Sequence, residues 1–172
     1  MSEYTVVVAD GVRARFFTLE KAKDPDNESG PKLIEHESLL NPDKNVPEST
    51  RTGNNNSGRT RAPSGGSYAF DDHRGKHEQE VLRRFAEKVV AAAIKKTRLG
   101  EARRSLVLAA EGKVLGALRA ELETIKTNGM EIRECDCDMA GETPLHIHEL
   151  LAKRALIPAM NKPAKRGGLL RG

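Results

Sequence analysis

Residues 3–19 read EYTVVVADGVRARFFTL, and this stretch decides the fold. Residues 3–9 and 12–19 are rich in β-branched and apolar side chains, as strands are. Between them, Asp10-Gly11 suits a tight hairpin turn, because both residue types tolerate a positive φ. The stretch therefore predicts two antiparallel strands. A weaker third strand at residues 32–39 would extend them into a meander.

The chain beyond the meander alternates helical and strand patterns. Residues 76–98 place apolar side chains on one helical face and basic ones on the other. Residues 105–110 form an apolar run short enough for a buried parallel strand. Three further elements are expected: a helix that uses Val114 to Ile125, a strand at residues 130–136, and a helix with Thr143 as N-cap and Pro144 at its first position.

This order of elements predicts a single α/β domain over residues 1–156. A three-stranded antiparallel meander followed by strand–helix crossovers gives one mixed sheet of about five strands, two of them parallel, with flanking helices. That is the ribonuclease H-like arrangement. Residues 41–75 are dominated by Asn, Ser, Gly, Pro and Thr, so we expect a long mobile loop there. Residues 157–172 are basic and contain Pro and Gly, which predicts a disordered tail.

Composition excludes several classes of protein. The 172 residues are 37% hydrophobic and 31% charged, and no apolar run approaches the ~20 residues of a membrane span. The amino terminus lacks the pattern of a secretory signal, so a cytoplasmic location is expected. Cys135 and Cys137 are only two residues apart, a poor spacing for a structural disulfide, and we interpret both as free thiols.

The positive charge is concentrated in two segments. Residues 76–104 carry nine basic and four acidic side chains, and residues 153–172 carry six basic and no acidic ones. The helix and the preceding loop could therefore follow a phosphate backbone, with RNA or the ribosome as partner, although a merely solvated helix face is the simpler interpretation. Two aromatic residues in the polar loop could instead anchor a protein partner. The residues predicted to bind a partner are Arg59, Arg61, Tyr68, Phe70, Arg74, Lys76, Arg83, Arg84 and Lys88.

An enzymatic alternative also fits the predicted fold. A metal-dependent nuclease or hydrolase needs several carboxylates that converge near the centre of the sheet. The candidates are Asp10, Glu80, Glu111 and Asp138. Each also has a structural explanation, in a turn or near the amino terminus of a helix. No nucleophile turn or phosphate-binding loop is present, so the sequence does not require an enzyme, and no cofactor is expected.

A zinc site is a weaker alternative. Cys135, Cys137 and His146 are possible ligands. However, His146 and His148 are two residues apart on a predicted helix and point about 200° from each other, so they cannot both face one ion. Surface histidines are the simpler interpretation.

Several segments resemble the bacterial host attachment protein family. They are Val7-Val8-Ala9-Asp10-Gly11-Val12-Arg13-Ala14-Arg15-Phe16-Phe17, Arg84-Phe85-Ala86, Val107-Leu108-Ala109-Ala110, Leu115-Gly116-Ala117-Leu118-Arg119 and Asp138-Met139. The resemblance covers about residues 4 to 152. It implies a fold like the middle domain of archaeal and eukaryotic peptide-release factors and of Pelota. The Gly-Gly-Gln loop of those factors is absent here, where Gly65-Gly66-Ser67 stands instead. The family is linked by name to attachment to host cells. Because no export signal is visible, we expect a non-enzymatic cytoplasmic binding protein whose role in attachment is indirect.

Overall fold

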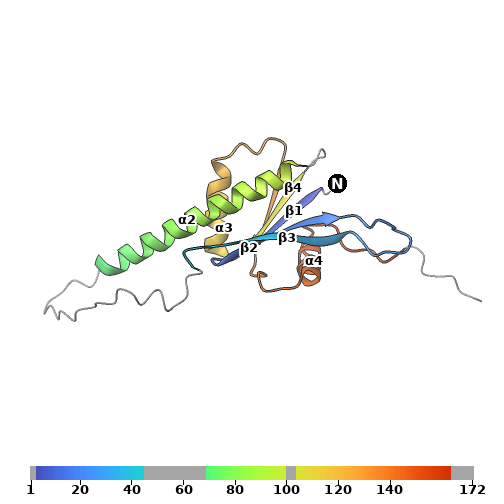
Figure 1. The fold of residues 1–172 in the computed structure, drawn as a ribbon, viewed down its shortest axis with the longest axis horizontal. Helices are drawn as coiled ribbons and strands as arrows, with labels where there is room; N and C mark the ends of the chain where they lie inside the picture. The colour runs from blue at the N-terminus through green and yellow to red at the C-terminus, as the bar shows by residue number, and fades with distance from the viewer. Residues whose placement is uncertain (1–2, 45–68, 100–103, 164–172) are drawn as a thin grey trace, which may run out of the picture.

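One mixed sheet with helices on both faces forms the body of the protein (Figure 1). The computed structural model describes residues 3–44, 69–99 and 104–163, with only the backbone of residues 69–73. In spatial order the five strands are β3 (Lys32–Leu40), β2 (Arg13–Glu20), β1 (Tyr4–Ala9), β4 (Ser105–Ala110) and β5 (Glu131–Asp136). The helices in the described ranges are α2 (Ala69–Arg98), α3 (Gly112–Glu123) and α4 (Pro144–Lys153).

The strand directions confirm the predicted mixed sheet. β1 pairs antiparallel with β2, and β2 pairs antiparallel with β3. β1 also pairs in parallel with β4, which pairs in parallel with β5. The antiparallel meander and the two parallel strands therefore lie where the sequence places them. The ribonuclease H-like class and the relation to release factors stay predictions.

The turn between β1 and β2 is made by a side chain rather than by backbone in the left-handed region. Asp10 Oδ1 accepts hydrogen bonds from the backbone N–H groups of Val12 at 2.7 Å and Arg13 at 2.8 Å. Among the described residues, only Ala155 and Gly129 have a positive φ, so Gly11 does not need its conformational freedom here. The hairpin is as predicted, but its physical cause is the Asp10 carboxylate.

Alternation along the strands divides the core into two layers. Val7 and Phe16 belong to the layer under α2 and α3, whereas Val6 and Phe17 belong to the layer under α4. These four side chains are completely buried. Burial of one such side chain contributes about 1.5–3 kcal/mol. The central strand β4, which is covered on both faces, is buried along its whole length.

α2 begins seven residues earlier than the sequence pattern indicates. The predicted boundary between the loop at residues 41–75 and the helix at residues 76–98 is wrong, because residues 69–75 are already helical. Figure 1 shows the first turns of α2 projecting beyond the sheet. Residues 74–79 are all exposed, so this part of the helix needs no apolar face and carries no periodic signal. Residues 45–68 of the predicted loop lie outside the described residues.

The carboxyl-terminal segment packs on the body where a disordered tail is predicted. The Thr143 hydroxyl accepts from the backbone N–H of His146 at 3.2 Å, so the predicted N-cap of α4 is confirmed. After α4, Ile157 is buried among the apolar residues of this layer. Asn161 then exchanges two backbone hydrogen bonds with Gly30. Apolar burial and this bridge hold residues 157–161 in place, whereas the prediction for residues 164–172 falls outside the described chain.

Candidate functional site

The exposed side of α2 is the candidate interaction surface. All residues from Arg74 to Gln79 are exposed, and packing against the body begins only at Val81. At 1.5 Å per residue, the 12 residues from 69 to 80 span about 18 Å. The helix thus carries side chains away from the sheet into solvent, where a large partner can reach them.

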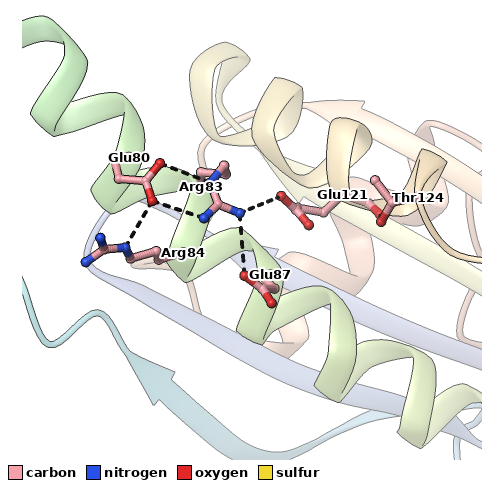
Figure 2. A network of polar contacts seen from close by, with 6 residues as sticks. All are labelled: Glu80, Arg83, Arg84, Glu87, Glu121 and Thr124. Carbon is pink, nitrogen blue, oxygen red and sulfur yellow. Dashed lines mark hydrogen bonds and ion pairs between the residues drawn. The ribbon is translucent and has the colours of Figure 1, made fainter.

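A network of ion pairs occupies the middle of this helix (Figure 2). Arg83 donates two hydrogen bonds of 3.0 Å to Glu80, and its Nη1 lies 3.6 Å from Glu87. The same Nη1 lies 3.7 Å from Glu121, a residue of α3. Arg84 Nε adds a 3.1 Å contact with Glu80. The hydrogen bonds from Arg83, and then from Arg84, lower the pKa of the Glu80 carboxyl to about 2.

The network changes what Arg83 and Arg84 can do. Arg83 is surrounded by three carboxylates, so little positive potential is left for an external phosphate. Within the part of the chain that the structure describes, the ion-pair partner of Arg84 is Glu80, and the two side chains are 62% and 43% exposed. Water screens an exposed pair of this kind, so Arg84 can exchange its partner at little cost. The two arginines, equivalent in the sequence, therefore differ in availability.

The other residues predicted to bind a partner fall into three groups. Arg74, Lys76 and Lys88 are exposed residues of α2, although Arg74 and Lys76 point about 200° from each other. Phe70 belongs to the first turn of α2, but its side chain is not among those described. The remaining predicted residues, Arg59, Arg61 and Tyr68, lie outside the described residues.

A cavity of about 600 Å³ lies between the amino-terminal half of α2, the start of α3 and the β1–β2 turn. Gly11 follows β1 and Lys113 follows β4, so the cavity lies outside the carboxyl ends of two parallel strands, a usual place for ligands in α/β proteins. Its charged lining is mixed: the basic residues are Lys44, Arg83 and Lys113, and the acidic ones are Glu78 and Glu121.

The four candidate carboxylates do not assemble into a metal site. Asp10 serves the β1–β2 turn, and Glu80 belongs to the network on α2. Glu111 stands at the N-cap position of α3, where its side chain makes no capping hydrogen bond to the described residues, and Asp138 accepts from the backbone N–H of Ala140 at 3.3 Å. Within residues 3–44, 69–99 and 104–163, no group of three or more His, Cys, Asp and Glu residues could hold a metal ion. The nuclease alternative therefore gains no support from the positions of these carboxylates.

The cysteines were expected as free thiols, and this expectation is wrong. Cys135 and Cys137 form a disulfide, with their Cα atoms 5.5 Å apart. β5 ends at Asp136, so Cys137 lies beyond the regular strand, and the chain can bring the two sulfurs together. His146, the third possible zinc ligand, contacts Glu142 instead. The two cysteine sulfurs of the predicted zinc site are bonded to each other and are therefore not thiolate ligands.

His148 also differs from its expected surface position. It is buried at 1% exposure, and its Nε2 lies 2.8 Å from the carbonyl oxygen of Pro158. The sequence predicts correctly that His146 and His148 point in different directions. The burial of His148 depends on the later segment that folds back over α4. The only local signal for this burial is the position of His148, one residue after the inward-facing Ile147.

The arginines of the hairpin motif hold the body together. Arg15 donates from Nε and Nη2 to the two carboxylate oxygens of Glu35, each at 2.7 Å. Its Nη1 reaches the carbonyl oxygens of Ala140 and Glu142, and Arg13 also donates to Ala140. The hydrogen bonds from Arg15 to Glu35 lower the pKa of the Glu35 carboxyl. The motif therefore fixes the turn before α4, a role that the sequence does not reveal.

Comparison with protein families identifies a match over most of the chain. A family model described as "Protein required for attachment to host cells" matches residues 5–151, which is most of the chain. No curated protein matches the sequence. The matched range includes the sheet except for Tyr4, together with α2, α3 and most of α4. Within the described residues, no helix is both long and apolar enough to cross a bilayer.

Proposed function

The chain belongs to the family of proteins required for attachment to host cells, and we propose that it is a non-enzymatic cytoplasmic protein that binds RNA, with ribosomal RNA as the main partner. Its role in attachment is then indirect. The observation that carries the proposal is the set of exposed basic residues along α2, Arg74, Lys76, Arg84 and Lys88. The projecting turns at residues 69–80 also carry four acidic residues beside Arg74 and Lys76.

Basic side chains outnumber acidic ones along residues 69–98, eight to five, which favours a phosphate backbone as the partner. Arg74 and Lys76 are exposed on the projecting turns, where they point about 200° from each other, and Lys88 is exposed nearer the body. Each cation that neutralises a phosphate releases condensed counterions, which makes such binding strong at low salt and weak at high salt. Arg84 joins them when it leaves Glu80, whereas Arg83 stays with its three carboxylates. The mixed charge of α2 keeps this binding moderate.

The predicted loop and tail extend the proposed surface. Arg59, Arg61, Tyr68 and Phe70 precede the packed part of α2 in the chain. Two aromatic rings near several cations suit single-stranded RNA, because bases stack on such rings with about 1–3 kcal/mol each.

Co-sedimentation with purified ribosomes at several salt concentrations tests this function. The triple variant Arg74→Ala, Lys76→Ala, Lys88→Ala should bind more weakly. If each residue contacts one phosphate, the slope of log K against log salt should fall in magnitude by about 2 to 3. A charge-matched control, Lys23→Ala, Lys32→Ala, Lys126→Ala, changes exposed lysines outside α2 and should leave the slope unchanged. Binding that is absent, or that both triple variants weaken equally, would contradict the proposal.

A further inference from the structure

The disulfide between Cys135 and Cys137 lies at an edge of the sheet, on β5 and just beyond its end. Cys135 is 6% exposed and belongs to the apolar layer under α4, whereas Cys137 is only partly buried. Of the two residues, Cys137 is therefore the more accessible to a thiol from solvent. The chain contains no other cysteine, so no further thiol competes for either sulfur.

This disulfide adds little to what already holds the chain in place. The entropic stabilisation by a disulfide grows with the length of the loop that it closes, and this loop spans only residues 135–137. Other contacts fix the same part of the chain. The backbone N–H of Cys137 donates to the carbonyl oxygen of Ala110 at 3.1 Å, and Arg13 and Arg15 donate to the carbonyl oxygen of Ala140. The path of the chain after β5 is thus held without the S–S bond.

The reduced form suits the same surroundings. A free cysteine packs like a small hydrophobic side chain. Cys135 shares a buried apolar cluster with Met139, Ile147 and Leu151, which accommodates a neutral thiol. The fold is therefore compatible with both redox states, as an exchangeable disulfide requires.

We propose that Cys135 and Cys137 form a reversible redox couple that exchanges with a small cellular thiol such as glutathione. Disulfides in the cytoplasm are usually catalytic or redox-sensing, and this step of the argument rests on the proposed function, which places the protein there.

The exchange begins when the thiolate of one glutathione attacks the sulfur of Cys137. The S–S bond breaks, and its electron pair goes to the sulfur of Cys135, which then takes up a proton. A second glutathione thiolate attacks the glutathione sulfur of the mixed disulfide, and the Cys137 sulfur leaves as a thiolate and is protonated. The products are two protein thiols and one glutathione disulfide, so two electrons pass to the protein. Reoxidation by glutathione disulfide follows the same steps in reverse.

Incubation of the folded full-length protein with glutathione tests the couple. With reduced glutathione in large excess and no urea, acid quenching, alkylation and mass spectrometry should find both cysteines alkylated. An excess of glutathione disulfide should then restore the unalkylated protein. The circular dichroism spectrum should be the same in both states, and the urea midpoint should change little. A structural disulfide would instead resist glutathione until urea unfolds the chain. Such resistance, or loss of secondary structure on reduction, would overturn the proposal.

Two single variants identify the sulfur at which exchange begins. Cys135→Ser keeps the more exposed cysteine, and Cys137→Ser keeps the buried one. With glutathione disulfide, Cys135→Ser should form a mixed disulfide about tenfold faster or more, because exposure controls thiol reactivity. Equal rates in the two folded variants, checked by circular dichroism, would overturn the assignment of Cys137 as the point of attack. All these measurements are made without ribosomes, so their failure is distinguishable from a failure of RNA binding.

Discussion

Replacement of Arg15 by leucine should destabilise the protein strongly, because Arg15 joins three parts of the fold. Its side chain is 10% exposed and makes two hydrogen bonds to the Glu35 carboxylate and two to backbone carbonyl oxygens. Removal of one partner from a buried ion pair costs about 3–5 kcal/mol. The Glu35 side chain is 32% exposed and regains some hydration, so the lower value, about 3 kcal/mol, applies.

Urea denaturation followed by circular dichroism measures this loss. For a protein of this size, about 3 kcal/mol should also lower the Tm by about 6–12 °C. The control is Arg119→Leu, which breaks another Arg–Glu pair with several hydrogen bonds, to Glu134, but whose arginine is 52% exposed. Water screens that exposed pair, so its loss should destabilise the protein much less than the loss of Arg15. Equal losses for the two variants would refute the view that burial gives the Arg15 pair its importance.

Three further predictions concern titration and helix capping. The Glu80 carboxyl should titrate at about 2 in ¹³C NMR spectra and move toward its ordinary value in Arg83→Ala, because Arg83 is the largest cause of the shift; a normal pKa in the unmodified protein would contradict the network. Because the pKa of Glu35 is lowered in the folded protein, its ionised carboxylate stabilises the fold fully above the pKa of the unfolded chain, and this stability is lost as pH falls through the pKa of the folded protein. The urea concentration at the unfolding midpoint should therefore decrease below about pH 4, and it should decrease less steeply in Glu35→Gln. Thr143→Ala should cost about 1 kcal/mol and Thr143→Ser much less, since serine keeps the capping oxygen; equal losses would exclude the cap as the cause.

Much of the sheet could be predicted because its physics is local. Alternating apolar residues around Asp10-Gly11 specify a hairpin, and a continuous apolar run such as residues 105–110 specifies a strand covered on both faces. The packed part of α2 is visible from its helical periodicity. The first turns of α2 could not be predicted, since the exposed residues 74–79 need no apolar periodicity and their polar composition resembles that of a loop.

The site was harder to predict because its key contacts join distant segments. Glu80 and Glu87 lie within one helical turn of Arg83, so those pairs could be expected, but Glu121 comes from another helix. Arg15 meets Glu35 across neighbouring strands, and His148 is buried by a segment that sequence composition assigns to a tail. The Cys135–Cys137 disulfide depends on the path of the chain after β5, which periodicity does not describe.

Amide hydrogen exchange of the full-length protein, with and without ribosomes at low salt, tests the proposed function most directly. Amides in projecting helical turns open locally and exchange fast, so a bound partner should slow them. The account predicts new protection over residues 69–88 of α2, which is lost at high salt. Unchanged exchange there, or protection confined to β3 and α4, would contradict it.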